Sequence, residues 1–591
     1  MYHGPLALTA ALLIAVSTPV RAGVQGIEGN WKVSYVTNGN IEHSFAIIKL
    51  NIDGGKSSGE LVTAPRFGVT LKSVTQEGNI LRIVMKISAD ELVYEGAVPK
   101  KGNEHLLGNL TFGSMTYPAG LSGTDEVKID PKMVTRVLAC PPLQEARTLA
   151  NKVLQLRLQA QQTKDADKKN DLLKQAAEAD EAAKKKSPEL YRDVVSKYAD
   201  SPMVFEAVLG LMRTARANDA KSDEVKAWAT TGINAAKAYG PRYQSDFAAQ
   251  TASVLVGQEG FALLAVEYAR LAEKALTPKT PAADQVRILS LLSRALQKAG
   301  NADDAKTLDI RVAKLDDILD KEYSSKMPGF KGEVFTGRKS KSERAVFMEL
   351  FTGATCPPCV AADLAFDVLQ KTYKANELVL IQYHVHIPGP DPLTNPDTEA
   401  RWAYYRKQVG GVPASLFNGQ PKPGGGGPAA FAEKKYEQYR GVIEPLLEED
   451  ANVKLTVSAK RNGDKIEIHV KVSGLNEPGT DKKLRILLAE ETVRYLGSNR
   501  IRLHHNVVRA FPGGVEGISL KETAAKQNVS ISIGDLRGRL DKYLTDFETK
   551  GRTFANPARP IALERLRVIA FVQDDVTHDI LQAVQVQVDD K

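Results

Sequence analysis

Two cysteines three positions apart carry the clearest chemical signal in this chain. Residues 356–359 read Cys-Pro-Pro-Cys and contain two of the three cysteines among 591 residues. This spacing lets one helical turn make and break a disulfide. At a helix N-terminus, unpaired N–H groups and the positive end of the helix dipole stabilise a thiolate. The motif therefore predicts thiol–disulfide exchange, with Cys356 as the nucleophile and Cys359 as the resolving thiol.

The residues around this motif predict the elements that position it. Residues 345–352 are apolar enough for a short buried strand, residues 353–355 suit a tight turn, and the apolar positions after Cys359 recur with helical spacing. A second buried strand is expected over 378–384. Pro357 and Pro358 suit a first helical turn, although each removes an N–H donor from it. The thiolate's pKa is therefore not fixed by the sequence.

With these elements in place, residues 333–449 resemble an α/β thioredoxin-like domain of the secreted TlpA type. The resemblance rests on the CPPC motif, the strand at 378–384 and the sequence Gly-Gly-Val-Pro at 410–413, which precedes a further expected strand. It implies that Pro413 follows a cis peptide bond and faces the cysteines. It also implies that the Val412 backbone is offered to an extended substrate.

The same resemblance assigns further site residues. Glu349 lies near the position where thioredoxins carry a buried acid, so we expect it to relay the proton of the resolving thiol. The catalytic set is then Cys356, Cys359, Glu349 and Pro413, and the substrate-binding set is Val412, Pro357, Pro358 and Trp402.

An insertion separates the second strand from Pro413. Residues 387–396 contain four prolines and read as a loop, and residues 397–408 read as a helix that carries Trp402, Tyr404 and Tyr405. One interpretation is a lid or substrate groove near the cysteines. The other is a cover for the sheet edge. The sequence favours neither.

Two other uses of the cysteine pair compete with exchange. Cys356, Cys359, His384 and His386 make a nominal zinc ligand set, but strand histidines more often form hydrogen bonds only. A purely structural disulfide is the second alternative, although so short a loop removes little entropy from the unfolded chain. His504 and His505 would face opposite sides of a strand, which favours one buried, hydrogen-bonded ring and one exposed ring over metal ligation. We therefore expect no metal and no cofactor besides the cysteine pair.

The first residues predict export. Residues 6–16 form an apolar run of signal-peptide length, and Val-Arg-Ala at 20–22 resembles a cleavage site, so residues 1–22 are interpreted as a signal peptide. The first five residues contain no lysine or arginine, which leaves an uncleaved membrane anchor as the alternative. No later stretch is apolar enough to span a bilayer. The expected location is the bacterial periplasm or the cell exterior.

Composition narrows the range of partners. The chain is 43% hydrophobic with a net charge of +8, and its acidic and basic residues are interspersed. Without an arginine-rich patch interleaved with aromatics, nucleic-acid binding is not expected. The expected partners are protein thiols or disulfides and a protein that regenerates the cysteine pair.

Two β-rich regions and one helical region complete the expected multidomain fold. Residues 23–131 are β-rich and predict a small barrel or sandwich. Residues 452–591 contain an alternating hairpin and further buried strands, which predicts an immunoglobulin-like or fibronectin-like sandwich. Roughly the last 250 residues resemble bacterial surface proteins that join a thioredoxin domain to such a sandwich.

Residues 141–325 have helical periodicity, with breaks expected at 186–188, 200–202, 240–241 and 278–281. Their alanine spacing is similar to that of degenerate tetratricopeptide repeats, but plain close packing of helices gives the same spacing. Cys140 lies at the start of this region, and we expect it to be buried. The alternative is a disulfide with Cys356 or Cys359, which would have to form across domains.

Two functions remain at this point. The first is a secreted thiol–disulfide oxidoreductase whose direction is open, because reductases, oxidases and isomerases share these residues. The second is a periplasmic or surface scaffold in which the helices and β-domains bind partners and the thioredoxin-like domain is redox-inactive.

Overall fold

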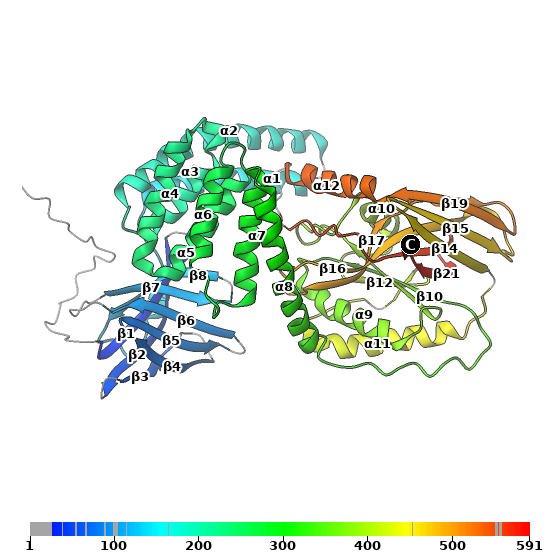
Figure 1. The fold of residues 1–591 in the computed structure, drawn as a ribbon, viewed down its shortest axis with the longest axis horizontal. Helices are drawn as coiled ribbons and strands as arrows, with labels where there is room; N and C mark the ends of the chain where they lie inside the picture. Colours follow the sequence, from blue (N-terminus) through cyan, green and yellow to red (C-terminus); the bar gives the residue numbers. More distant parts are fainter. Residues whose placement is uncertain are drawn as a thin grey trace, which may run out of the picture. The chain divides into compact units, whose positions relative to one another are not determined.

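The computed structural model describes residues 27–37, 40–53, 56–65, 68–87, 90–98, 105–113, 115–163, 165–422, 424–451, 453–549, 554 and 558–590. The chain divides into two units, Met1–Leu319 and Asp320–Lys591 (Figure 1). The expected signal peptide and its cleavage site lie outside the described residues. None of the helices in the described ranges is both long and apolar enough to cross a membrane.

The first unit begins with an antiparallel sheet in the order β3-β2-β1-β8-β7-β6-β5-β4. The two end strands, β3 and β4, pack against each other, so the sheet forms a nearly closed barrel, drawn in blue in Figure 1. Alternate residues such as Trp31, Val33 and Tyr94 fill its interior. The expected β-rich region is thus confirmed as a barrel. Its strands are β1 (Gly29–Thr37), β2 (Ile41–Asp53), β3 (Lys56–Thr63), β4 (Val69–Glu77), β5 (Ile80–Ile87), β6 (Asp90–Ala97), β7 (His105–Phe112), β8 (Met115–Gly123) and β9 (Thr135–Val137), which pairs with β2.

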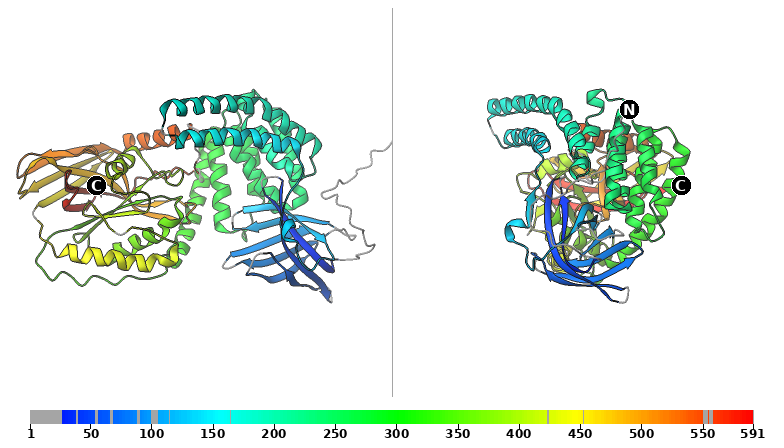
Figure 2. Two further views of the ribbon diagram at one scale, coloured as in Figure 1. Left: turned by 180° about the vertical axis from the view of Figure 1, so that it is seen from behind. Right: turned by 90° about the vertical axis from the view of Figure 1, so that its left-hand side faces the viewer.

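A helical segment follows the barrel. Figure 2 shows its first two helices as a long antiparallel pair in cyan. The expected breaks at 200–202, 240–241 and 278–281 are confirmed, but the break at 186–188 is wrong because α2 continues through the buried Pro188. The assignment to tetratricopeptide repeats stays a prediction. The helices are α1 (Pro141–Gln162), α2 (Ala166–Lys197), α3 (Met203–Arg213), α4 (Ser222–Ala236), α5 (Pro241–Val256), α6 (Ala262–Lys274), α7 (Ala282–Lys298) and α8 (Ala302–Lys326).

Cys140 is buried at the N-terminus of α1, as expected. It packs with Leu143, Val194 and Met203, and its thiol is free. Burial raises the pKa of this thiol, so at neutral pH it is a weakly reactive packing residue.

The second unit contains a nine-stranded sheet in the order β13-β12-β10-β11-β17-β16-β20-β21, with β18 added to β16. β10 pairs with β11 in parallel, and β11 pairs with β17 in parallel. The other pairs in this sheet are antiparallel. The strands are β10 (Val346–Thr352), β11 (Leu378–His384), β12 (Ala414–Phe417), β13 (Gln420–Pro421), β16 (Gly479–Arg494), β17 (Leu503–Ala510), β18 (Ile518–Leu520), β20 (Leu566–Asp574) and β21 (Ile580–Gln587).

Each face of β10 has its own core. Val346, Met348 and Leu350 pack under α9 (Val360–Thr372) and α11 (Ala432–Leu447). Phe347 and Phe351 lie on the other face, where α10 (Pro396–Tyr405) and the C-terminal strands cover them. Because side chains alternate between the two faces, only those on the face that packs against α9 lie on the side of the cysteine pair.

A second, four-stranded sheet contains the expected hairpin of β14 (Lys454–Asn462) and β15 (Lys465–Ser473). It also contains β19 (Ala525–Ser532) and β22 (Asp589–Asp590), and α12 (Ile533–Thr549) packs nearby in the same core. The expected boundary at 449/452 falls inside one unit, because strands from both sides of it share the nine-stranded sheet. Residues 452–591 therefore do not stand apart as a separate sandwich.

Candidate functional site

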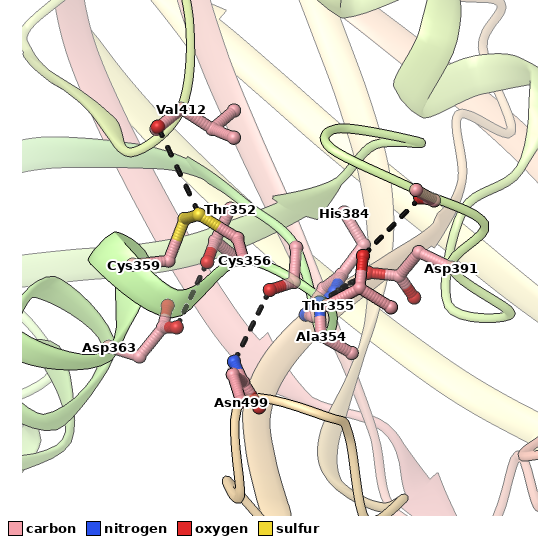
Figure 3. Close-up of a disulfide and its surroundings, with 12 residues drawn as sticks. Thr352, Ala354, Thr355, Cys356, Cys359, Asp363, His384, Asp391, Val412 and Asn499 are labelled. Carbon is pink, nitrogen blue, oxygen red and sulfur yellow. Dashed lines mark hydrogen bonds and ion pairs between the residues drawn. A yellow bond between two sulfur atoms is a disulfide. The ribbon is translucent and has the colours of Figure 1, made fainter. Parts of the chain in front are cut away.

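The cysteine pair lies where a strand and turn lead into a helix. Cys356 and Cys359 form a disulfide with a Cα–Cα distance of 5.3 Å, and α9 begins at the next residue (Figure 3). The side chains of Pro357 and Pro358 are exposed, whereas Cys356 is only 1% exposed and Cys359 is fully buried. The surface next to the disulfide is thus formed by the two prolines.

The backbone at Val412 and Pro413 faces the disulfide. The Val412–Pro413 peptide bond is cis, as the resemblance implied. The carbonyl oxygen of Val412 lies 4.0 Å from the sulfur of Cys356 (Figure 3). This part of the predicted substrate-binding set is therefore brought together with the cysteines.

A run of four glycines, residues 424–427, also lies against the motif. The amide of Gly427 donates to the carbonyl of Pro358 at 2.7 Å, and its carbonyl accepts from the amide of Ala361 at 3.0 Å. A Cβ on Gly426 would lie 1.7 Å from the Pro358 carbonyl oxygen, so only glycine permits this approach. We call residues 424–427 the glycine segment. The glycine segment was not predicted as part of the site, although four consecutive glycines are a visible signal in the sequence.

The turn before Cys356 is held from one side by Asp391. Its carboxylate accepts from the amide of Ala354 at 2.6 Å, from the amide of Leu393 at 2.9 Å and from the ring of His384 at 2.8 Å. Asp391 and His384 are both fully buried. Burial alone would raise the pKa of Asp391, but His384 and the backbone amides outweigh it and lower that pKa. An ionised carboxylate therefore fixes this turn.

Asn499 holds the same turn from the other side. Its backbone amide donates to the carbonyl of Ala354 at 3.2 Å, and its side-chain amide donates to the carbonyl of Gly353 at 3.3 Å (Figure 3). Asn499 belongs to the connection between β16 and β17, about 140 residues after the motif. Nothing in the local sequence pattern indicated that the C-terminal part of the chain contributes to this site.

The inserted residues 387–408 lie in two places, one for each of the two interpretations. Residues 389–391 contact the turn, since Thr355 donates to the carbonyl of Gly389 at 3.4 Å and Asp391 binds as described. The helix α10 instead packs on the sheet face, with Trp402 5.2 Å from the ring of Phe351. The loop lies at the site, and the helix covers the sheet.

Glu349 is not at the disulfide. Its carboxylate accepts from Arg401 at 2.8 Å, Tyr405 at 2.8 Å and Tyr383 at 3.1 Å, all of them buried. Glu349 shares its face of β10 with Phe351 and Trp402, whereas α9, which follows Cys359, packs on the opposite face. The expected proton relay by Glu349 and the expected substrate contact by Trp402 do not fit these positions.

Asp363 is the buried acid on the side of the cysteines. It lies in α9 four residues after Cys359, so both side chains share one helix face (Figure 3). Thr352 donates to its carboxyl at 3.0 Å, and Gln382 donates at 3.4 Å. Burial raises the pKa of Asp363 well above the usual range, and the nearby Asp367 and Asp391 add to the effect, against the hydrogen bond from Thr352. The signal missed in the sequence was an acid on the apolar face of the expected helix.

The histidines considered as zinc ligands have other partners. His384 binds Asp391, while His386 bonds to the hydroxyl of Tyr543 at 3.0 Å and stacks on Phe547. Within the part of the chain that the structure describes, no group of three or more His, Cys, Asp or Glu is arranged to hold a metal ion.

His504 and His505 face opposite ways, as expected. His504 is buried, bonds to the carbonyl of Tyr495, and has its pKa lowered to about 3 by burial and the neighbouring His384. His505 is half-buried rather than exposed and lies 2.7 Å from Asp367. Burial opposes its charge, but Asp367 outweighs burial and raises the pKa of His505.

Asp391→Ala is expected to destabilise the oxidised protein by on the order of 2–4 kcal/mol, since it leaves two amides and a histidine N–H buried without their acceptor. Urea unfolding followed by circular dichroism measures this loss. Asp391→Asn keeps one acceptor oxygen and should cost less. Equal stability of wild type and Asp391→Ala would contradict the described role of this carboxylate.

No protein-family model matches the chain, and no curated protein matches it. Among solved structures, HBP35 of Porphyromonas gingivalis aligns over 42% of this chain and 77% of its own, with 15% identity and a TM-score of 0.30. The β-glucosidase of Kluyveromyces marxianus in complex with glucose aligns over 26% of this chain and 17% of its own, with 15% identity and a TM-score of 0.12. Likenesses this low carry no argument, so the functional case rests on the site itself.

Proposed function

We propose that this protein is a thiol–disulfide oxidoreductase that acts through Cys356 and Cys359 in a thioredoxin-like part of the second unit. The observation that carries the proposal is the disulfide at the start of α9 with the Val412 carbonyl 4.0 Å from Cys356. A backbone carbonyl beside the reactive sulfur supplies an edge on which an extended substrate can form main-chain hydrogen bonds. The parallel pair β10–β11, with α9 and α11 on one face, supports the thioredoxin-like assignment.

In the reducing direction, the thiolate of Cys356 attacks one sulfur of a substrate disulfide. The substrate S–S bond breaks, a mixed disulfide forms, and the other substrate sulfur leaves as a thiolate that takes up a proton. The thiolate of Cys359 then attacks the sulfur of Cys356. This step forms the Cys356–Cys359 disulfide and releases the second substrate sulfur, so two electrons pass to the substrate. The oxidising direction is the same sequence in reverse.

Within this proposal, Asp363 takes the proton-relay role first assigned to Glu349. Its raised pKa lets the carboxyl accept the proton that Cys359 loses on becoming nucleophilic and return it later. Glu349 is held by Arg401 on the other face of β10 and serves packing instead.

Asp363→Asn is expected to slow exchange by roughly a hundredfold or more, because a positioned acid or base is lost. It should also flatten the pH dependence of stability. Because the folded-state pKa is raised, Asp363 favours folding below its unfolded value of about 3.9, and this contribution is lost as pH rises towards the folded-state pKa. Unfolding free energies and exchange rates at several pH values measure both effects, and parallel pH profiles of wild type and variant would contradict the role.

The burial of both cysteines favours a second candidate function. The two cysteines are 0–1% exposed, and the glycine segment forms hydrogen bonds to Pro358 and Ala361 beside them. A buried, covered disulfide of this kind also suits a redox-inactive structural unit. In that case the protein is a scaffold that binds partners through its helices and β-sheets.

The reduction potential of the cysteine pair distinguishes the two functions. The full chain would be equilibrated in glutathione buffers and its free thiols alkylated and counted by mass spectrometry. A reversible two-thiol transition between roughly −100 and −300 mV supports exchange and indicates its direction. A disulfide that stays closed well below this range supports the scaffold. Cys140 gives a constant background that Cys140→Ser removes.

We further propose that the protein is secreted or periplasmic, because residues 1–22 have the pattern of a cleaved signal peptide. Expression in a bacterial host followed by N-terminal sequencing of the exported protein is expected to give Gly23 as the first residue. Retention of Met1 on a membrane-bound product would favour the anchor instead.

A further inference from the structure

One face of the four-stranded sheet in the second unit is exposed and carries an excess of lysines. Its strands β14, β15 and β19 lie side by side (Figure 1), and residues such as Ile466 and Ile468 point into the core. Because side chains alternate along a strand, the residues between them form the opposite face. We call this exposed face of β14, β15 and β19 the lysine face. Its acidic and basic residues are Lys454, Lys460, Lys465, Glu467, Lys471 and Lys526.

Two of these lysines lie directly opposite each other. Lys471 of β15 and Lys526 of β19 are partners in the antiparallel register. Lys454 of β14 is paired with Ser473, so it lies diagonally from Lys471. Side chains directly opposite each other have Cβ atoms about 5 Å apart, and like charges at that distance repel. The three lysines therefore concentrate positive charge at one end of the face.

No acid in the described part of the chain neutralises these three lysines. The single glutamate of the face, Glu467, lies 3.8 Å from Lys465 instead. Glu477 and Glu522 belong to the connections beyond the strand ends, and neither forms an ion pair with the three lysines. The repulsion on the lysine face is therefore uncompensated among the described residues.

The exposed strands of the barrel arrange their charges differently. Lys72 of β4 forms an ion pair with Glu91 of β6, and Arg82 of β5 forms one with Glu95 of β6 at 3.2 Å. Opposite charges on neighbouring strands stabilise a sheet, whereas like charges destabilise it. The arrangement on the lysine face is thus one that a negatively charged partner would stabilise.

The chemistry of this face fits an anionic lipid surface. Its exposed residues are all polar or charged, so it has no apolar side chain to insert between lipid tails. It has no Phe, Tyr or Trp on which the bases of a nucleic acid could stack. A lysine ammonium is a compact charge on a flexible stem and adapts to headgroups that have no fixed geometry. Clusters of about four to eight basic residues are typical of binding to anionic lipids.

We propose that the lysine face binds the surface of bilayers that contain anionic lipids. The ammonium groups of Lys454, Lys471 and Lys526 lie among the phosphates of the headgroups, which neutralise their mutual repulsion. Lys460 and Lys465 add to the attraction from the same face. The protein then lies on the bilayer without entering it. This inference does not rest on the cysteine chemistry.

Co-sedimentation of the full chain with vesicles tests the lysine face. Vesicles of equal parts phosphatidylglycerol and phosphatidylcholine should bind the protein saturably, and vesicles of phosphatidylcholine alone should not. Raising NaCl from about 0.1 M to 1 M should release it, because the Debye length falls from about 10 Å to about 3 Å. The triple variant Lys454→Gln, Lys471→Gln and Lys526→Gln should bind roughly a hundredfold more weakly, since each lysine near an anionic surface contributes about fivefold in affinity.

The triple variant Lys331→Gln, Lys407→Gln and Lys434→Gln is the matched control. It removes the same charge from three exposed lysines outside the four-stranded sheet, so it should bind like the wild type. Lys526→Glu separates binding from folding, because it places an acid opposite Lys471. It should unfold in urea at no lower concentration than the wild type, yet bind the mixed vesicles about twenty-fivefold more weakly.

The lysine face is not the binding surface if the two triple variants bind the mixed vesicles equally well. The inference also fails if the wild type does not distinguish these vesicles from pure phosphatidylcholine. Heparin serves as a soluble polyanion for comparison. If the wild type binds heparin through these lysines but does not bind the vesicles, the partner is a soluble polyanion and the proposed lipid surface is wrong.

Discussion

Replacing Cys356 with serine is expected to reduce thiol–disulfide exchange by at least roughly a thousandfold, because the attacking thiolate is lost and no other group substitutes for it. Replacing Cys359 should give a different result. Cys359→Ser leaves the nucleophile intact but removes the thiol that resolves the mixed disulfide, so a covalent complex with substrate should accumulate. Exchange with a fluorescent disulfide peptide measures the first effect, and non-reducing electrophoresis with mass spectrometry measures the second.

Cys140→Ser is the matched control for both variants. This thiol is free and buried in a packing cluster of the first unit, so exchange should continue at the wild-type rate. Full activity in Cys356→Ser would contradict the proposed mechanism. A trapped complex in Cys356→Ser, but not in Cys359→Ser, would reverse the roles of the two thiols.

Arg401→Met is expected to destabilise the protein by about 3–5 kcal/mol, because it leaves the carboxylate of Glu349 buried without its counter-charge. Arg401 and Glu349 are both fully buried and lie 2.8 Å apart. The double variant Arg401→Met with Glu349→Gln removes both charges and should recover much of the loss. Urea unfolding of the four proteins gives the coupling free energy directly.

The same variants test where the proton relay lies. Glu349→Gln should leave the exchange rate of the folded protein within about twofold of the wild type, since Glu349 lies on the opposite face of β10 from α9. Asp363→Asn should slow exchange as stated above. If Glu349→Gln is the slower of the two, the original assignment from the sequence was right and the relay does not pass through Asp363.

The comparison of Glu349 with Asp363 shows how far sequence reasoning reaches. The strand at 346–352, the turn, the disulfide spacing and the helix after Cys359 were all predictable, because each depends on local pattern. The proton-relay position depended on which face of the strand packs against α9. All seven residues of β10 are buried, so both faces of this strand are covered. The polarity of its residues therefore does not show which face packs against α9.

The contact of Asn499 with the turn was not predictable for a different reason. Asn499 reaches the turn only because β17 pairs with β11, and this pairing joins residues more than 100 positions apart. No local periodicity encodes such a contact. The alternation of the hairpin over 454–473 predicted the start of a new domain, whereas this hairpin marks only a change from one sheet to another.

The shared sheet has a consequence for how this chain can be inherited or divided. A fragment ending near residue 450 would keep both cysteines but lose the strand that covers the edge of β11 and the asparagine that holds the turn. The cysteine-bearing part is therefore not a complete structural unit that could be transferred to another gene by itself. Recombination that preserves the redox centre has to carry the last 140 residues with it, so the two segments are expected to evolve as a single inherited block.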